Sequence, residues 1–474
     1  MIRVARRALR NQSSFYTEYE TKGKIVMKKA GKINKTYLWK ILLSIVLTGS
    51  CCFVLLLFTG LIPRSAIKES CIESAEYFSE YGMFPCLTEG QLNTKKDNYS
   101  DCILVDIMYH ISQDELVKST VKASYYQPET TTINIGFMDS LKEDKVPNVE
   151  YSRYWHGTLT FLRPLFTFTD IQGARAVLAT VWIALTIGNL FLLWKEKAKV
   201  LAVCYLLSNI WLQAWVCTTC IQYSTMFFMM NGVSMAVICL FRKGKDIESL
   251  YRKIGILMAT SGVCTCFIDF LTVETVSVTV PLLMLLVLRY EAGELSEWKT
   301  EFLRIASWGL TWGAGYALMF VFKWILVTIC FGRESLLLAL SSAGERFLGE
   351  TYMGGISLTP IASASELFFG AIFRNQGMLF PYKENMSAMA GFLSFFAVIF
   401  LCGSLIYLFR GKNFSGKMLL LCAILGAVPY IRFMVLQNHA FIHYFFTYRA
   451  QMVTVTALLY VTWKFGLGNV FGKK

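Results

Sequence analysis

Charged side chains are scarce in this sequence. Asp, Glu, Lys and Arg together make up only 16% of its 474 residues, whereas soluble domains carry roughly 25%. Hydrophobic residues make up 55%, and the mean hydropathy is +0.47. A protein in water would need an improbably large core to bury this much apolar surface, whereas a bilayer solvates it directly. The scarcity of charge argues against a soluble globular protein and predicts an all-α polytopic membrane protein.

Several motifs of soluble enzyme families are also missing. The sequence contains no Walker phosphate-binding loop, no GxGxxG after a predicted strand, no HExxH and no GxSxG. Nucleotide hydrolysis, zinc proteolysis and serine hydrolysis therefore have no support. The sequence also contains no obvious internal repeat and no stretch that predicts a separate soluble domain.

Positive charge, by contrast, is in excess, with a formal net charge of +14 at pH 7. Lys and Arg gather in the N-terminal tail, residues 1–39, and in the short gaps between apolar stretches. This placement is typical of the cytoplasmic segments of membrane proteins. We therefore expect the lipid bilayer as a partner, and no nucleic acid.

Ten apolar stretches are predicted to cross the membrane. They cover about residues 41–61, 174–193, 200–216, 221–241, 254–271, 276–288, 305–331, 386–408, 418–435 and 450–463. Residues 40–465 would form a transmembrane domain, with a long outer loop at 62–171 and a second outer segment at 332–385. An even number of spans puts both termini on one side, and the basic gaps fall on that side too. We expect a multi-pass plasma-membrane protein whose tails, 1–39 and 466–474, are cytoplasmic.

The long outer loop contains three of the fourteen cysteines, Cys71, Cys86 and Cys102. In an extracytoplasmic loop, two of them could form a disulfide and leave one unpaired, and the sequence does not say which two. Most of the other cysteines lie inside apolar stretches and are interpreted as small buried hydrophobic residues.

Two acids of the same loop, Asp97 and Asp101, are four residues apart. On a helix, this spacing places both carboxylates on one face. At a membrane surface, such a pair could act as a general base or hold a cation. A divalent metal ion is therefore compatible with the pair, although no cofactor is expected. Alternatively, both are solvated charges like the other acids of this polar loop.

A segment rich in aromatic residues, 151–157, lies near the end of the loop and contains Arg153 and His156. Its rings could stack on the C–H faces of a sugar, and its arginine could bind phosphate oxygens. An aromatic belt with a snorkelling arginine would have the same composition. The sequence leaves both interpretations open.

His439, His443 and Arg449 lie near another predicted outer edge of the membrane. The two histidines are four residues apart, which suits metal chelation on a helix, but no cysteine or acidic ligand is adjacent. A proton relay or a phosphate contact fits better, and interfacial hydrogen bonding is the plainer alternative. We therefore predict no metal site.

This layout resembles the GT-C superfamily of integral-membrane glycosyltransferases, which includes protein mannosyltransferases and aminoarabinose transferases. A basic N-terminus and one span precede an acidic outer loop, which ends in the aromatic and arginine segment from Tyr151 to Pro164. Arg175 stands at the start of the second span, and short-looped spans and a second outer segment follow. The likeness covers about residues 40–465 and is one of topology.

The resemblance implies transfer of a sugar from a polyprenyl-phosphate donor to an envelope acceptor, an unknown glycan or lipid, on the extracytoplasmic side. It implies that an acid of the outer loop, Asp97 or Asp101, is the catalytic base that activates the acceptor. It also implies that basic residues on the outer side bind the donor's phosphate. The candidates for that role are Arg153, His156, Arg175, His439, His443 and Arg449.

Other assignments remain open. Glu69, Glu73 and Glu76 lie closer to the first span and are alternative candidates for the base. A transporter or flippase of a lipid-linked glycan is a second class of function. It predicts functional charges near the middle of the membrane, for which Lys323 and Asp269 are the candidates. A non-catalytic membrane scaffold is the third hypothesis, and it predicts that no loop acid faces a shared cavity.

Overall fold

The computed structural model describes most of the chain. The described residues are 35–129, 131–244, 246–348, 351–353, 356–358, 364–380, 388–411 and 414–471. Residues 1–34 and 472–474 of the predicted tails lie outside them, as does part of the predicted outer segment 332–385. The chain divides into two compact units, residues 1–44 and 45–474, and the second contains every candidate site residue.

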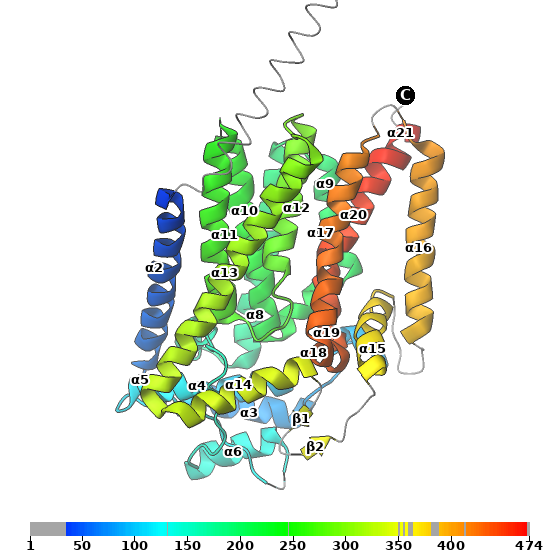
Figure 1. Ribbon diagram of the computed structural model, residues 1–474. Coiled ribbons are helices and arrows are strands. Elements are labelled where there is room, and N and C mark those ends of the chain that lie inside the picture. The colour runs from blue at the N-terminus through cyan, green and yellow to red at the C-terminus, as the bar shows by residue number, and fades with distance from the viewer. Residues whose placement is uncertain are drawn as a thin grey trace, which may run out of the picture. The chain divides into compact units, whose positions relative to one another are not determined.

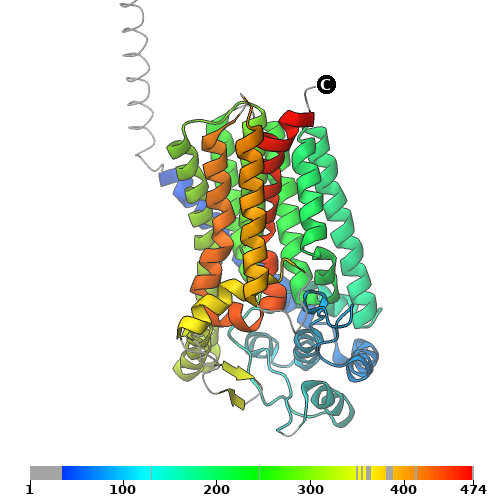
Figure 2. The same cartoon turned by 90° about the vertical axis from the view of Figure 1, so that its right-hand side faces the viewer.

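Long helices make up most of the second unit. Helix α2 (Lys35–Gly60) crosses the boundary between the two units. The others are α8 (Ile171–Lys195), α9 (Lys199–Trp211), α10 (Ile221–Lys243), α11 (Ile247–Ile268), α12 (Val276–Glu291), α13 (Trp298–Phe331), α16 (Ala388–Phe409), α17 (Gly416–Val435) and α20 (Met452–Thr462). Figures 1 and 2 show α10, α11, α12 and α17 running roughly side by side.

Six helices are long and apolar enough to cross a membrane, namely α2, α8, α10, α13, α16 and α17. They coincide with six of the ten predicted spans. The described part of the chain is therefore a helical membrane protein, and the strands found in it form one short hairpin. The other four predicted spans fall on α9, α11, α12 and α20, which are shorter or carry charges. The count of ten is therefore not confirmed.

Helix α12 shows why a short helix can lie among the spans. It has 16 residues, or about 24 Å of helix, against ~30 Å of hydrocarbon in a bilayer. Its residues 276–289 are all buried by neighbouring helices. Because protein rather than lipid surrounds it, its length does not have to match the bilayer.

The predicted outer loop folds as short helices at one end of the long ones, which we call the loop end (Figure 1). These are η1 (Arg64–Ala66), α3 (Lys68–Tyr81), η2 (Leu92–Thr94), α4 (Asn98–His110), α5 (Leu116–Lys122), α6 (Ile133–Glu143) and α7 (Leu159–Leu165). Helix α21 (Gly468–Phe471) lies at the opposite end (Figure 1). The loop end therefore gathers the acids and aromatic residues that the sequence singled out.

The second predicted outer segment contributes further elements to the loop end. It holds α14 (Arg333–Leu348), the antiparallel strands β1 (Thr351–Met353) and β2 (Ile356–Leu358), and α15 (Ala364–Gly377). A short helical turn, η3 (Ala214–Thr219), connects α9 to α10. After α17 come α18 (Gln437–Ile442), α19 (Tyr444–Thr447) and η4 (Tyr448–Gln451), and a π-helical turn (Trp463–Leu467) follows α20. Helix α14 packs against both α13 and α18.

Helices α11 and α13 approach each other closely at two glycines. A Cβ on Gly262 would lie 2.1 Å from the carbonyl oxygen of Trp312, and a Cβ on Gly315 would lie 2.2 Å from that of Ala259. Glycines of this kind let helix backbones meet inside a membrane. The connection that follows α11 carries Phe270, which lines the cavity at the loop end.

Candidate functional site

A cavity of about 290 Å³ lies at the loop end of the second unit. Its walls come from the stretch between α3 and α4, the start of α4, the segment between α5 and α7, the start of α10, the α11–α12 connection and the helices α18 and α19. These segments are far apart in the sequence, and only the fold brings them together. Among the predicted site residues, it is lined by Asp97, Arg153, His439 and His443.

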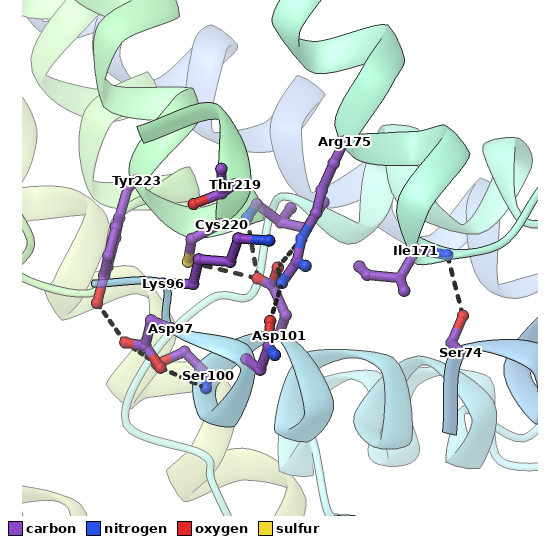
Figure 3. Close-up of polar contacts among 12 residues, drawn as sticks. Ser74, Lys96, Asp97, Ser100, Asp101, Ile171, Arg175, Thr219, Cys220 and Tyr223 are labelled. Atoms are coloured by element: carbon purple, nitrogen blue, oxygen red, sulfur yellow. Dashed lines mark hydrogen bonds and ion pairs between the residues drawn. The ribbon is translucent and has the colours of Figure 1, made fainter. Parts of the chain in front are cut away.

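Asp97 is the N-cap of α4 and faces this cavity. Its Oδ1 accepts a hydrogen bond from the Ser100 backbone N–H at 2.9 Å, and its Oδ2 accepts one from the Ser100 hydroxyl at 2.9 Å. The hydroxyl of Tyr223, at the start of α10, donates a third to Oδ2 (Figure 3). These donors fix the carboxylate, which is only 3% exposed.

Burial raises the pKa of Asp97 above the ordinary value of a carboxyl group. The hydrogen bonds from Tyr223 and Ser100 and the charge of Arg175 oppose this rise, and burial outweighs them. A carboxylate with a raised pKa is a stronger base, because it holds a proton more firmly. Asp97 is therefore not the solvated charge that the sequence left open as an alternative.

Asp101, one turn further along α4, lies in a buried ion pair instead. Its Oδ2 accepts hydrogen bonds from Arg175 Nε at 3.1 Å and Nη2 at 2.8 Å, and its Oδ1 accepts one from the Ile221 backbone N–H at 2.9 Å. Arg175 also donates to the side chain of Asn98 at 2.8 Å. Figure 3 shows this pair beside Asp97. Neither Asp101 nor Arg175 lines the cavity, so this geometry favours a structural role for both.

Arg153 brings a positive charge to the cavity wall. Its guanidinium carbon lies 4.1 Å from the ring centroid of Tyr151 and 5.5 Å from that of Tyr154. Its Nε is buried and has no hydrogen-bond partner in the described part of the chain. An arginine that is stacked on rings but not paired with a carboxylate can donate to the oxygens of an anionic ligand.

A second cation, Lys95, also lines the cavity and was not among the residues predicted from the sequence. Its Nζ lies 4.8 Å from the ring centroid of Phe84 and 5.0 Å from that of Phe445. No described carboxylate forms an ion pair with Lys95 or with Arg153. The position of Lys95, two residues before Asp97, was the signal in the sequence that could have identified it.

His439 and His443 lie together on the cavity wall, with ring centroids 4.7 Å apart. Helix α18 ends at Ile442, and His443 is its C-cap. Within the described ranges, no group of three or more His, Cys, Asp or Glu side chains is placed to hold a metal ion. Their place in the lining lets the two imidazole rings contact a ligand in the cavity.

The other two predicted phosphate contacts, His156 and Arg449, lie outside the lining. The His156 ring packs against Tyr151 and Phe270 at centroid distances of 5.0 and 4.9 Å. Burial, followed by the charges of Lys323 and Arg153, holds the pKa of His156 well below its ordinary value, so this ring is neutral at pH 7.

Arg449 is buried among backbone carbonyls. It donates to the oxygens of Leu212 at 3.1 Å, Phe445 at 3.1 Å and Asn93 at 2.7 Å. These bonds tie η4 to the segment just before Lys95. Arg449 thus positions the cavity wall rather than reaching into the cavity.

Aromatic rings cover much of the remaining wall. The sequence pointed to the 151–157 segment, but rings from several other parts of the chain also take part. They are Phe84, Tyr99, Tyr125, Tyr223, Phe270, Tyr444, Phe445 and Phe446. Flat rings beside polar groups are suited to binding the C–H faces of a sugar. No sequence pattern identified these residues, because the fold alone brings them to one cavity.

The alternative bases and the outer-loop cysteines are placed elsewhere. Glu69, Glu73 and Glu76 are exposed on α3 and do not line the cavity. All fourteen cysteines lie in described residues and none of them forms a disulfide, so the bond that the sequence allowed among Cys71, Cys86 and Cys102 is absent. The outer loop is therefore held together by packing and hydrogen bonds.

Comparison of the chain with protein-family models, with curated proteins and with solved structures finds no match. Any conclusion about function therefore depends on the geometry of the cavity.

Proposed function

We propose that the protein is a membrane glycosyltransferase that moves a sugar from a polyprenyl-phosphate donor to an envelope acceptor. The observation that carries the proposal is the composition of the cavity wall. One buried carboxylate, Asp97, shares it with two cations that no described carboxylate neutralises, Lys95 and Arg153, and with many aromatic rings. This combination matches the three parts of such a reaction, which are a hydroxyl, a sugar ring and a phosphate.

The reaction proceeds by substitution at the anomeric carbon of the donor sugar. The acceptor hydroxyl oxygen attacks this carbon, and Asp97 takes the hydroxyl proton. The bond between the anomeric carbon and the phosphate oxygen breaks, and its electron pair stays on the polyprenyl phosphate. Lys95 and Arg153 stabilise the negative charge that develops there. The proton then passes from Asp97 to solvent, which restores the base.

The position of the cavity agrees with a donor that cannot leave the membrane. The cavity lies at the loop end of helices that are long enough to cross a bilayer. We place this end on the extracytoplasmic side of the plasma membrane. Helices α9, α11, α12 and α20 then complete ten crossings, and both termini are cytoplasmic, as the positive-inside rule favours.

Transport of a lipid-linked glycan is the alternative. The two charged residues proposed for it, Lys323 and Asp269, form hydrogen bonds with the backbone of the protein. Lys323 donates from Nζ to the carbonyl oxygen of Val121 at 2.7 Å. Asp269 accepts from the backbone N–H groups of Leu271 at 2.9 Å and Thr272 at 3.0 Å. These contacts hold segments of the loop end, so they give transport no specific support.

The experiment is a sugar-transfer assay with purified protein and a panel of polyprenyl-phosphate sugars. Wild type should transfer one of these sugars, and Asp97→Asn should bind the same donor without transferring it. Glu73→Gln, which removes an exposed acid of α3, is the matched control and should retain activity. Failure of wild type with every donor and acceptor, together with movement of a lipid-linked glycan across vesicles, would establish transport instead.

A further inference from the structure

A second hollow lies between the C-terminal half of α13 and the first turns of α14. It has a volume of about 360 Å³ and is lined by Val321, Trp324, Ile325, Ile329, Leu336 and Leu340 together with Thr328. The Thr328 hydroxyl donates to the carbonyl oxygen of Trp324 at 2.8 Å, so the lining offers almost no polar group. Ile325 is 51% exposed and Ile329 74%. We call this hollow the α13–α14 groove.

A line of aromatic rings joins this groove to the candidate site. Tyr154 lines the cavity, and its ring centroid lies 6.4 Å from that of Phe320. The Phe320 centroid lies 5.8 Å from that of Trp324, which lines the groove. Phe320 and Trp324 are four residues apart and therefore share one face of α13. One ring, that of Phe320, thus lies between the Tyr154 ring of the cavity wall and the Trp324 ring of the groove.

Another apolar hollow serves as a comparison. It has about 250 Å³ and lies between α16, α17 and α20, with Ala423 and Tyr430 in its lining. The Tyr430 hydroxyl donates to Gln451 at 2.9 Å. Ring contacts lead from Tyr430 to Phe395 and Phe433, but among the described residues none continues to a ring of the cavity wall. Apolar character alone therefore does not distinguish the two hollows, whereas connection to the cavity does.

We propose that the α13–α14 groove binds the polyprenyl chain of the donor, next to its phosphate. This assignment rests on the proposed function, because it takes the phosphate to be held by Lys95 and Arg153. A chain attached to that phosphate must leave the cavity along an apolar surface, and Phe320 and Trp324 provide one. The ring contacts lead from the groove to the wall of the cavity that would hold the donor's phosphate, so we assign the groove to the polyprenyl chain of that donor and not to a bilayer phospholipid.

The test uses a polyprenyl phosphate that carries a photoreactive group near its phosphate end and no sugar. The full-length protein in lipid nanodiscs is irradiated with this probe, and labelled peptides are identified by mass spectrometry. Residues 321–340 should be labelled several-fold more than the α16–α17–α20 hollow. Unlabelled polyprenyl phosphate should compete, and phosphatidylglycerol should not. Equal labelling of both hollows, or equal competition by the phospholipid, would overturn the assignment.

Two matched variants add a second readout. Ile325→Trp fills the α13–α14 groove, and Ala423→Trp fills the comparison hollow; both positions are exposed, so the substitutions should not disturb folding. Ile325→Trp should lower labelling and donor affinity several-fold, and Ala423→Trp should change neither. The reverse pattern would overturn the assignment. Because the probe has no sugar, labelling is independent of transfer. Selective labelling without any sugar transfer would therefore reject the glycosyltransferase and keep the polyprenyl site.

Discussion

Asp97 caps the start of α4 and Asp101 lies in its first turn, and their surroundings give them different chemistry. Asp97 lines the cavity and is held by the hydroxyl and amide donors of Tyr223 and Ser100. Asp101 is paired with Arg175 and lies outside the lining. A carboxylate that faces a cavity can take a proton from a ligand, whereas a carboxylate in a buried ion pair mainly joins helices. Two acids at helical spacing in the sequence therefore do not necessarily have the same role.

The largest expected effect is on the rate of the Asp97→Asn variant. Loss of a general base slows transfer by about 10²–10⁴-fold, and the hydrogen bonds to Ser100 can persist with the amide. Single-turnover transfer and donor binding measure the two quantities separately. Asp114→Asn, which changes an exposed acid of the same loop, is the control and should transfer at the wild-type rate. Equal rates for Asp97→Asn and Asp114→Asn would contradict the assignment of the base.

Substitutions in the Asp101–Arg175 ion pair should change the free energy of unfolding. Arg175→Met leaves the fully buried carboxylate of Asp101 without its cation, which costs about 3–5 kcal/mol of unfolding free energy. Thermal unfolding of the purified protein measures the loss. Adding Asp101→Leu to Arg175→Met removes the unpaired charge and should restore much of the stability. A double variant as unstable as the single one would show that the unpaired carboxylate of Asp101 is not the cause of the loss.

Arg153 and Arg449 extend the comparison to the cations. Arg153→Gln should lower the transfer rate by about 10²-fold, because one donor to the developing phosphate charge is lost. Arg153→Lys should recover part of the rate, since it keeps the charge but not the planar fork. Arg449→Gln should instead lower the unfolding temperature, because its carbonyl contacts are structural. An unchanged rate in Arg153→Gln would remove this residue from the phosphate site.

The smallest expected effect is a shift of the pH profile in Tyr223→Phe. Transfer requires the deprotonated form of Asp97, so the rate should rise with pH through the raised pKa of this carboxyl group. The Tyr223 hydroxyl favours the deprotonated form, and its removal should raise the pKa of Asp97 further. The rising limb should therefore move to higher pH, and Ser100→Ala should move it in the same direction. A shift to lower pH would contradict this arrangement.

The sequence predicted the helical membrane fold from its composition, because apolar helices of sufficient length need no partner to be recognised. It also selected Asp97, Arg153, His439 and His443, which the fold brings to one cavity. It could not separate Asp97 from Asp101, because the decision depends on where Arg175 and the start of α10 lie. It missed Lys95 for the same reason, since its neighbours Phe84 and Phe445 are distant from one another in the sequence.

A structure of the Asp97→Asn variant with a bound polyprenyl-phosphate sugar would test the central claim most directly. We predict that the anomeric carbon of the sugar lies next to residue 97, with the phosphate between Lys95 and Arg153 and the sugar ring against the aromatic wall. A phosphate bound at Arg175 or Arg449, or a donor bound outside this cavity, would contradict the proposed site.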